Sequence, residues 1–546
     1  MFARIKKSGR YQYLQIVENR KRGGKVVQRV IATIGRMDQL QAKGRIETLI
    51  RSLSRYSEKV LLVLSGRSDP STQCKRIGPS LIFERLWEEL RIKKVIQDLL
   101  GERRFEFDVE RAIFLTVLHR LFVSGSDRAC EKWRRDYVIE GVNGLCLHHL
   151  YRAMAFVGEA LEDQKDATPF SPRCIKDVIE EGIFFESRDL FTGLDLVFFD
   201  TTSIYFEGEG GQTIGQKGHS RDHRPDLNQM VVGAVIDESG RPVCCEMWPG
   251  NTTDVKTLIP VMDRIRNRFG IGRFCIVSDR GMISAETLRA FEDPKREIPY
   301  IVGTRMRKVN EVKRRVLSRP GRYKEVYPEG KYTKDPAPLR VKEVRIDGTR
   351  YVVCLNTKQA RKDAADRQAL VESLKEKIKR DPKSLVGNKG YRKYLRFNRD
   401  SVMIDQDKIE FDCRFDGKWV LRTNTDLPAN RVALKYKELW QVEQVFRDIK
   451  SILETRPVFH QRDETIRGHV FCSFLALVLR KELDRRLHRA GHSFEWADIK
   501  QDLKALQETI IQDNGRRLAI RSECLGTCGK VFQAVGAALP PTIREI

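Results

Sequence analysis

The sequence lacks any long apolar run. Its longest strongly apolar stretch is Val470–Leu479, whereas a helix needs about 20 apolar residues to span a bilayer. The first residues, MFARIKKSGRYQYLQ, contain no apolar segment of the kind found in secretory signals. We therefore expect neither an integral membrane protein nor a secreted one.

A cysteine framework is also missing. Of the twelve cysteines, only the pairs Cys244–Cys245 and Cys524–Cys528 are close in sequence. Structural zinc sites use two paired clusters of ligands, and neither Cys146-Leu-His148-His149 nor His219-x-x-x-His223 has a credible second pair. Reduced thiols are the expectation.

Acidic residues are few relative to basic ones. Lysine and arginine number 101 against 75 acidic residues, a net charge of +26, which favours a polyanionic partner such as nucleic acid. Residues 1–36 contain only one acid, Glu18, and alternation in Tyr11–Val17 and Val26–Ile34 predicts two strands around a turn at 19–24. This basic ribbon is either a phosphate-binding element or a solvated edge hairpin.

The 546 residues are enough for several domains. Residues 37–190 are predicted to be mostly helical, from apolar spacing in segments such as Val109–Val123. The cationic patch Lys132-Trp-Arg-Arg135 within them fits a DNA-binding module, and ordinary helical packing explains the segment as well.

From residue 194 the pattern changes to an α/β order. Three antiparallel strands, the last two joined by a hairpin turn at 237–240, precede alternating helices and strands, which is the order of a ribonuclease-H-like mixed sheet. The predicted strands are 194–200, 230–236, 242–248, 274–278 and 300–302, and the predicted helices are 254–269 and 284–292. Further on, the pattern predicts strands at 341–346, 350–355, 408–415 and 419–423 and helices at 360–379 and 434–453.

Two acids follow hydrophobic strands. Asp200 and Asp279 each stand where a predicted strand stops, and ligand sites of α/β sheets form at strand ends. Aspartate is also common as a cap or turn residue after strands, so neither acid alone identifies a site.

A third acid lies on the predicted helix 434–453. At about 100° per residue, Tyr436, Glu443, Arg447 and Lys450 form one polar stripe beside an apolar face. A salt bridge between Glu443 and Arg447 is the alternative explanation. Three carboxylates on separate elements suit Mg²⁺, and two such ions support in-line displacement at phosphorus.

Four segments carry a family resemblance. They are Phe198-Phe-Asp200-Thr-Thr-Ser203, Gly250-Asn-Thr-Thr-Asp254, Val277-Ser-Asp279-Arg-Gly281 and Tyr436-x2-Leu-x3-Glu443-x6-Lys450. Together they resemble the DDE transposases of bacterial insertion sequences, most closely the branch grouped with insertion sequence four.

The resemblance implies a catalytic, metal-binding triad and a reaction. The triad would be Asp200, Asp279 and Glu443, with two Mg²⁺ ions, or Mn²⁺ as a substitute. The implied reaction is cleavage of DNA strands at the ends of the element and joining of the 3′-OH ends to target DNA. The implied partners are double-stranded DNA and a second copy of the chain when two ends are paired, in the bacterial cytoplasm at the nucleoid.

The resemblance also implies DNA contacts at Tyr436 and Lys450. Where the family has arginine, this chain has Leu439, and Arg447 on the same stripe is a candidate substitute. Further candidates are Arg280, next to the second acid, and two residues of the glycine-broken loop 215–224, which either grips the transposon end or has no role. These two residues are Lys217 and His219. Trp419 is either a core residue or a base-stacking one.

The expected organisation follows from these assignments. It comprises a basic β ribbon and helix (1–60), a helical region (61–190), the first part of the ribonuclease-H-like core (191–305), a mainly β insertion (306–425), the second part of the core with the catalytic helix (426–490) and a helical tail (491–546). Two alternative functions remain open: a metal-dependent nuclease on the same fold, and a DNA-binding protein with an inactive site.

Overall fold

The computed structural model divides into two compact units, Met1–Ala153 with Val478–Ile546, and Met154–Leu477. It describes residues 2–22, 25–42, 46, 49, 71–168, 171–186, 195–271, 274–327, 339–380, 391–397, 402–452, 455–513 and 516–546. No described helix has the length and apolar character to cross a membrane. All twelve cysteines are described, and all are free thiols.

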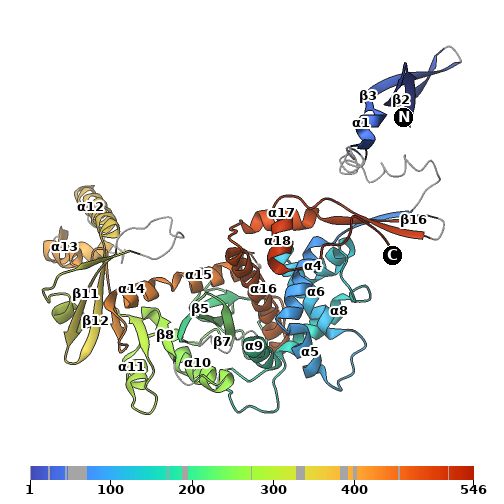
Figure 1. Ribbon diagram of the computed structural model, residues 1–546. Helices are drawn as coiled ribbons and strands as arrows, with labels where there is room; N and C mark the ends of the chain where they lie inside the picture. The colour runs from blue at the N-terminus through green and yellow to red at the C-terminus, as the bar shows by residue number, and fades with distance from the viewer. Residues whose placement is uncertain are drawn as a thin grey trace. The chain divides into compact units, whose positions relative to one another are not determined.

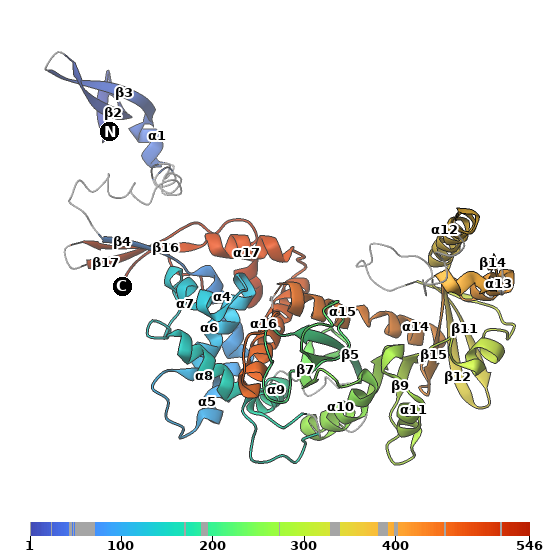
Figure 2. The ribbon, with the colours of Figure 1, turned by 180° about the vertical axis from the view of Figure 1, so that it is seen from behind.

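A nine-stranded mixed sheet forms the centre of the unit Met154–Leu477 (Figures 1 and 2), with the strand order β10-β11-β12-β15-β9-β8-β5-β6-β7. Its central strands are β5 (Leu196–Tyr205), β6 (Gln229–Asp237), β7 (Pro242–Pro249), β8 (Cys275–Ser278) and β9 (Tyr300–Gly303). β5, β6 and β7 form an antiparallel meander, and β8 and β9 add in parallel on the other side of β5. This order confirms the predicted ribonuclease-H-like mixed sheet.

The two faces of this sheet are covered by different helices. Val197 and Phe199 of β5 belong to a buried core together with residues of α10 (Asp254–Phe269) and α11 (Ala285–Glu292). On the other face, α15 (Trp440–Arg447) contacts β5 and β6, and α14 (Ala429–Lys437) contacts β8 and β9. Because side chains alternate along a strand, Asp200 faces α14 and α15.

The segment 306–425 extends the same sheet beyond β9. β15 (Lys418–Thr423) pairs antiparallel with β9, and β12 (Thr349–Asn356), β11 (Leu339–Ile346) and β10 (Lys324–Val326) follow outward. Beside them lie the π-helix η3 (Val312–Val316), α12 (Thr357–Arg380), the short helix η5 (Tyr391–Tyr394), the pair β13 (Leu395–Phe397) and β14 (Val402–Ile404), and α13 (Gln406–Cys413).

The predicted strand 408–415 is wrong, because this stretch forms α13. The Asp405 carboxylate accepts a hydrogen bond from the Lys408 backbone N–H, which stabilises a helix N-terminus. A local capping interaction therefore favours a helix in this stretch, where the sequence pattern predicted a strand.

The other unit contains two small sheets and a group of helices. β1 (Phe2–Ser8), β2 (Tyr11–Arg22) and β3 (Lys25–Arg36) form an antiparallel sheet followed by α1 (Met37–Ala42), and β4 (Ser71–Arg76) joins β16 (Gln507–Asp513), β17 (Arg516–Arg521) and β18 (Ile543–Glu545). The helices are α4 (Gly78–Glu89), α5 (Ile92–Leu100), α6 (Val109–Phe122), α7 (Asp127–Trp133), α17 (Trp496–Ala505) and α18 (Cys528–Val535). α8 (Leu147–Gly158) and α16 (Asp463–Arg489) cross the boundaries between the units, and α9 (Ile175–Glu186) belongs to the other unit.

Two expectations for this unit need correction. The N-terminal ribbon has three strands rather than two, because the basic segment Phe2–Ser8 also pairs as a strand. The C-terminal tail is not wholly helical, since β16, β17 and β18 lie within it. Gly23 and Gly24 of the predicted turn, and most of residues 43–70, lie outside the described residues.

Candidate active site

The register between β5 and β8 brings the first two acids together. These parallel strands pair from Leu196↔Cys275 to Phe199↔Ser278, so Asp200 and Asp279 occupy the next position on neighbouring strands. Neighbouring strands lie about 4.8 Å apart, and both side chains point to the face covered by α14 and α15. β5 does not stop at Asp200 as predicted. It continues to Tyr205, paired with β6.

Glu443 reaches this face from α15. The predicted single helix 434–453 is wrong: α14 ends at Lys437, α15 begins at Trp440, and a π-helix, η6 (Asp448–Ile452), follows. The expected straight stripe is therefore interrupted. Within α15, Val442, Val445 and Phe446 are buried and Glu443 is exposed, so the carboxylate does lie beside an apolar face.

The three acids line one cavity of about 290 Å³. It is lined by Asp200, Asp279, Trp419, Tyr436, Lys437, Leu439, Trp440 and Glu443. Lys437 and Trp440 were not among the predicted site residues, although Trp440 precedes Glu443 by three residues, which places both on one side of a helix. Leu439, at the position where the family has arginine, lines the cavity and is half-buried.

Tyr436 is connected directly to the second acid. Its hydroxyl donates a hydrogen bond to Asp279 Oδ1 at 2.9 Å. Burial, and then the Asp279 charge, raise the pKa of Tyr436 well above its ordinary value, so it remains a proton donor. Gly303 of β9 makes this approach possible, because a Cβ there would lie 2.4 Å from the tyrosine oxygen.

The environment of Asp200 disfavours its negative charge. Burial, together with the nearby charges of Asp279 and Asp254, raises the pKa of Asp200 to about 6, although Arg221 and the Thr201 backbone N–H lower it. The Arg221 guanidinium lies 3.8 Å from Asp200 Oδ1. Clustered carboxylate oxygens fit a hard divalent cation, and such a cation would compensate the negative charge that burial disfavours at Asp200. These residues can therefore bind such an ion.

Substitution of Asp200 by asparagine should stabilise the metal-free protein. Since the pKa of Asp200 is raised on folding, the stability contributed by its neutral form is complete below about pH 4 and is lost as pH rises through about 6. At pH 7.5 in a chelator, Asp200→Asn should thus raise the free energy of unfolding by roughly 3 kcal/mol. At pH 4 the gain should vanish, as measured by urea unfolding. An equal gain at both pH values would contradict this assignment.

Lys450, an expected DNA contact, is paired with a carboxylate of this chain. Its ammonium lies 2.9 Å from Asp222 Oδ1, and its side chain is only 12% exposed. Burial lowers the pKa of Lys450 in spite of the Asp222 charge. The other expected DNA contacts, Arg447, Lys217 and His219, are exposed and do not line the acid cavity.

Arg280 belongs to a second, cationic cavity that shares Asp279 with the first. This cavity of about 300 Å³ is lined by Asp279, Arg280, Gly281, Arg305, Met306, Arg307 and Lys308. Arg305 donates to the carbonyls of Arg280 and Gly281 at 3.2 and 2.9 Å. Three of these cations, Arg305, Arg307 and Lys308, follow β9 directly and form a cluster that is visible in the sequence but was not among the predicted site residues.

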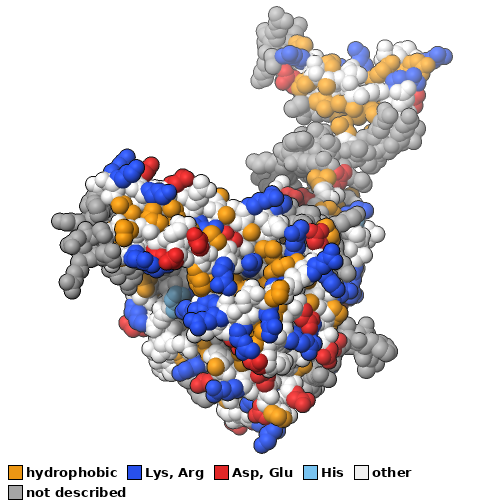
Figure 3. Space-filling model, turned by 90° about the vertical axis from the view of Figure 1, so that its left-hand side faces the viewer, with side chains coloured by type: hydrophobic (Ala, Val, Ile, Leu, Met, Phe, Trp, Pro, Cys, Tyr) orange, Lys and Arg blue, Asp and Glu red, His pale blue; other side chains and the backbone are white. Residues whose placement is uncertain are grey.

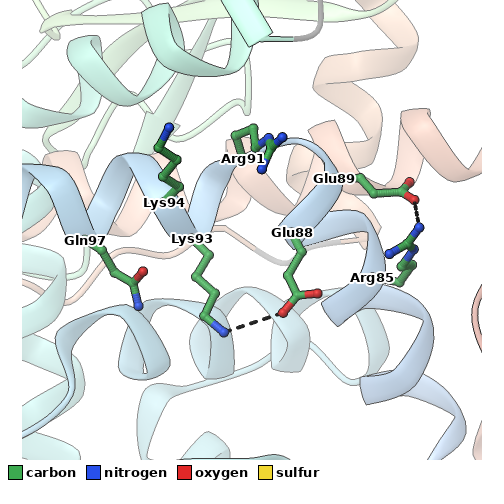
Figure 4. A pocket seen from close by; sticks show the side chains of 7 residues that line it. All are labelled: Arg85, Glu88, Glu89, Arg91, Lys93, Lys94 and Gln97. Atoms are coloured by element: carbon green, nitrogen blue, oxygen red, sulfur yellow. Dashed lines mark hydrogen bonds and ion pairs between the residues drawn. The ribbon is translucent and has the colours of Figure 1, made fainter.

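Two other clusters of charged or polar groups lie in the unit Met1–Ala153 with Val478–Ile546. A cavity of about 500 Å³ on α4 and α5 (Figure 4) contains Glu88 and Glu89, which already pair with Lys93 and Arg85. Ligand atoms of Glu106, His148 and His149 also lie within 4.8 Å of one another. However, His149 Nδ1 accepts the Cys146 backbone N–H, which places the proton of a neutral ring on Nε2. Neither cluster offers a set of free carboxylates.

Comparisons with known proteins give two family matches. Residues 192–479 match the model described as the transposase DDE domain, and residues 3–68 match the N-terminal domain of the IS1634 family transposases. No curated protein matches the sequence. Among solved structures, the cryo-EM structure of a piggyBac transposase synaptic complex with hairpin DNA is 10% identical, with a TM-score of 0.37 over 78% of this chain and 79% of that one.

Proposed function

Because the chain belongs to the transposases with a DDE domain, we propose that it binds the ends of its own insertion sequence, cleaves DNA there and joins the 3′-OH ends to target DNA. The family as a whole implies the use of divalent metal. The finer assignments, namely two Mg²⁺ ions, the named triad and a homodimer that pairs two ends, are part of this proposal. So is the branch grouped with insertion sequence four.

One observation carries the proposal: Asp200, Asp279 and Glu443 line a single cavity. They come from three elements that are far apart in the sequence, so local capping or turn formation does not explain their meeting. Two bound divalent ions would activate the attacking oxygen and stabilise the leaving oxygen of an in-line displacement. In this chain the three carboxylates would bind the ions, and Tyr436 would orient Asp279 through its hydrogen bond.

Cations beside the acids support a DNA substrate. The cavity of Arg280, Arg305, Arg307 and Lys308 adjoins Asp279, where a strand entering the acid cavity would present its phosphates. Lysine and arginine side chains are widespread on the face of the molecule shown in Figure 3. Because phosphate contacts dominate affinity for DNA, we assign the cavity around Arg280 to the DNA backbone next to the cut.

The decisive test uses a linear DNA fragment that carries the terminal inverted repeats of the element, incubated with the protein and Mg²⁺. A transposase yields products in which the element's 3′ ends are joined to target DNA. A plain nuclease on the same fold yields cleavage without joining, and a binding protein with an inactive site yields a complex without cleavage. Either of the last two outcomes would replace the proposal.

Deletion of residues 1–36 should weaken DNA binding and flatten its dependence on salt. The segment has ten basic residues and one acid, and Arg4, Gln15, Gln28 and Thr33 form a hydrogen-bonded row across its three strands. Each phosphate contact releases counterions, so removing several lowers the slope of log K against log salt by about 0.9 per contact. Titrations at several salt concentrations measure the slope, and an unchanged slope would show that the ribbon does not touch DNA.

A further inference from the structure

Two residues that flank α15, Tyr436 before it and Lys450 after it, make different contacts with acidic residues. Tyr436 precedes Glu443 by seven residues and donates to Asp279, the second acid. Lys450 follows Glu443 by seven residues and pairs with Asp222, which is not an acid of the triad. The second connection is complete only if Asp222 is itself tied to Asp200.

The neighbouring residue Arg221 provides that tie. Its backbone N–H donates to Ser203 Oγ at 2.9 Å, and its guanidinium donates to the Thr201 carbonyl and to Thr201 Oγ1 at 3.1 Å. The same guanidinium pairs with Asp254 Oδ2 at 2.7 Å and lies 3.8 Å from Asp200 Oδ1. Arg221 therefore contacts β5 at and just beyond the first acid.

Asp222, the next residue of the loop, contacts η6 and the segment after it rather than β5. Its Oδ1 pairs with both Lys450 of η6 and Arg456, while the side chain is only 8% exposed. Its Oδ2 is buried and, within the described part of the chain, has no hydrogen-bond partner. A buried carboxylate with an unsatisfied oxygen is costly, and here its two cationic partners hold it in place.

The loop that carries this pair is itself firmly attached. Gln216 and Gln229 exchange backbone hydrogen bonds at 3.0 and 3.1 Å. Gly218 packs so closely on the segment after β7 that a Cβ would lie 1.8 Å from the Gly250 carbonyl oxygen. Because the loop is anchored in this way, it can hold η6 at a fixed distance from β5.

We propose that Arg221 and Asp222 are positioning residues for the metal-binding acids, since they connect the strand of Asp200 to the helical turn behind Glu443 and fix the separation of these two carboxylates. This inference rests on the proposed function. It gives Lys450 a structural task in addition to any contact with DNA, and it explains why the lysine faces a carboxylate rather than solvent.

Metal affinity of the DNA-free, full-length protein tests the proposal. Isothermal titration with Mn²⁺ should show a 10- to 100-fold weaker affinity for Asp222→Asn, the range typical when a group that orients metal ligands is lost. The matched control is Asp226→Asn, in the same segment between β5 and β6, because the Asp226 carboxylate forms an exposed pair with Arg224 and contacts neither β5 nor η6 among the described residues. Its affinity for Mn²⁺ should stay within about 2-fold of the wild-type value.

A second variant protects the test against misfolding. Lys450→Gln breaks the same connection from the other side and leaves Asp222 paired with Arg456, so it should also weaken Mn²⁺ binding. The double variant should bind no more weakly than Asp222→Asn alone, because both changes break one connection.

The outcomes separate this inference from the proposed function. Mn²⁺ binding by Asp222→Asn at wild-type affinity would overturn the positioning role. So would unchanged Mn²⁺ affinity with tighter binding of terminal-repeat DNA, which would show that Asp222 masks a phosphate site instead. If the wild-type protein and Asp200→Ala gave the same Mn²⁺ titration, the acid cavity would not be a metal site, and the proposed function would fail with it.

Discussion

Replacement of Asp200, Asp279 or Glu443 by alanine is expected to lower the rate of strand cleavage by at least about 1,000-fold while leaving binding to the element's ends intact. Loss of one ligand removes several kcal/mol of charge stabilisation from the transition state, and about 4 kcal/mol corresponds to that factor. The effects should not add, because the three residues act as one unit. Cleavage of a labelled terminal-repeat fragment gives the rate, and gel shifts give the binding.

Glu286→Ala is the matched control for these three substitutions. Glu286 is an exposed acid on α11, which covers the opposite face of the sheet, so its loss should change neither cleavage nor binding. Near-normal cleavage by any one of the three alanine variants would remove that residue from the proposed triad. Failure of all four variants to bind DNA would point to misfolding instead.

Substitution of Arg268 should cause a large loss in the free energy of unfolding. Arg268 is fully buried and pairs with Asp177 at 3.2 Å, Glu180 at 2.7 Å and Glu246 at 3.4 Å, which join α9, α10 and β7. Burial alone would raise the pKa of Asp177. The charges of Lys176 and Arg268 outweigh this effect, so the pKa of Asp177 lies below its usual value. Arg268→Met would leave buried carboxylates short of a cation, at a cost of about 3–5 kcal/mol.

Urea unfolding of Arg268→Met against Arg266→Met measures this effect. Arg266 lies on the same helix and is half-buried, and it donates to the Arg296 carbonyl at 2.9 Å. Its substitution should cost about 1 kcal/mol, the value of a single hydrogen bond. Equal losses for the two variants would show that the buried ion network adds no stability beyond that of an ordinary contact.

Much of the central fold was predictable because its signals are local. The helix predicted at 254–269 coincides with α10, and β6 and β7 lie within about one residue of the predicted strands, as strong alternation and runs of Val and Ile allow. β5, in contrast, continues five residues beyond its predicted end. The break between Lys437 and Trp440 was not predictable from periodicity, because Leu439 fits a helix and only packing against the sheet reveals the interruption. The same break explains why the expected straight stripe failed.

Long-range partners account for what the sequence did not show about the site. Asp200, Asp279 and Glu443 stood out because each lies beside a strong apolar pattern. Arg221 and Asp222 are two charges in a glycine-broken loop, and nothing local indicates that one contacts β5 and the other η6. Lys450 was predicted to contact DNA, and its partner in this structure, Asp222, lies 228 positions away in the sequence.

The paired register of β5 and β8 constrains how this gene can change in length. Because the side chains of a strand alternate, an in-frame deletion of one codon between Leu196 and Phe199 would turn Asp200 toward α10 and out of the cavity. The same deletion between Cys275 and Ser278 would move Asp279 in the same way. A codon gained or lost at the exposed tip 238–239 of the β6–β7 hairpin leaves both acids in register. Among drifting copies of the element, length variants should therefore be inactive when they fall in these two four-residue stretches and often active when they fall in that hairpin.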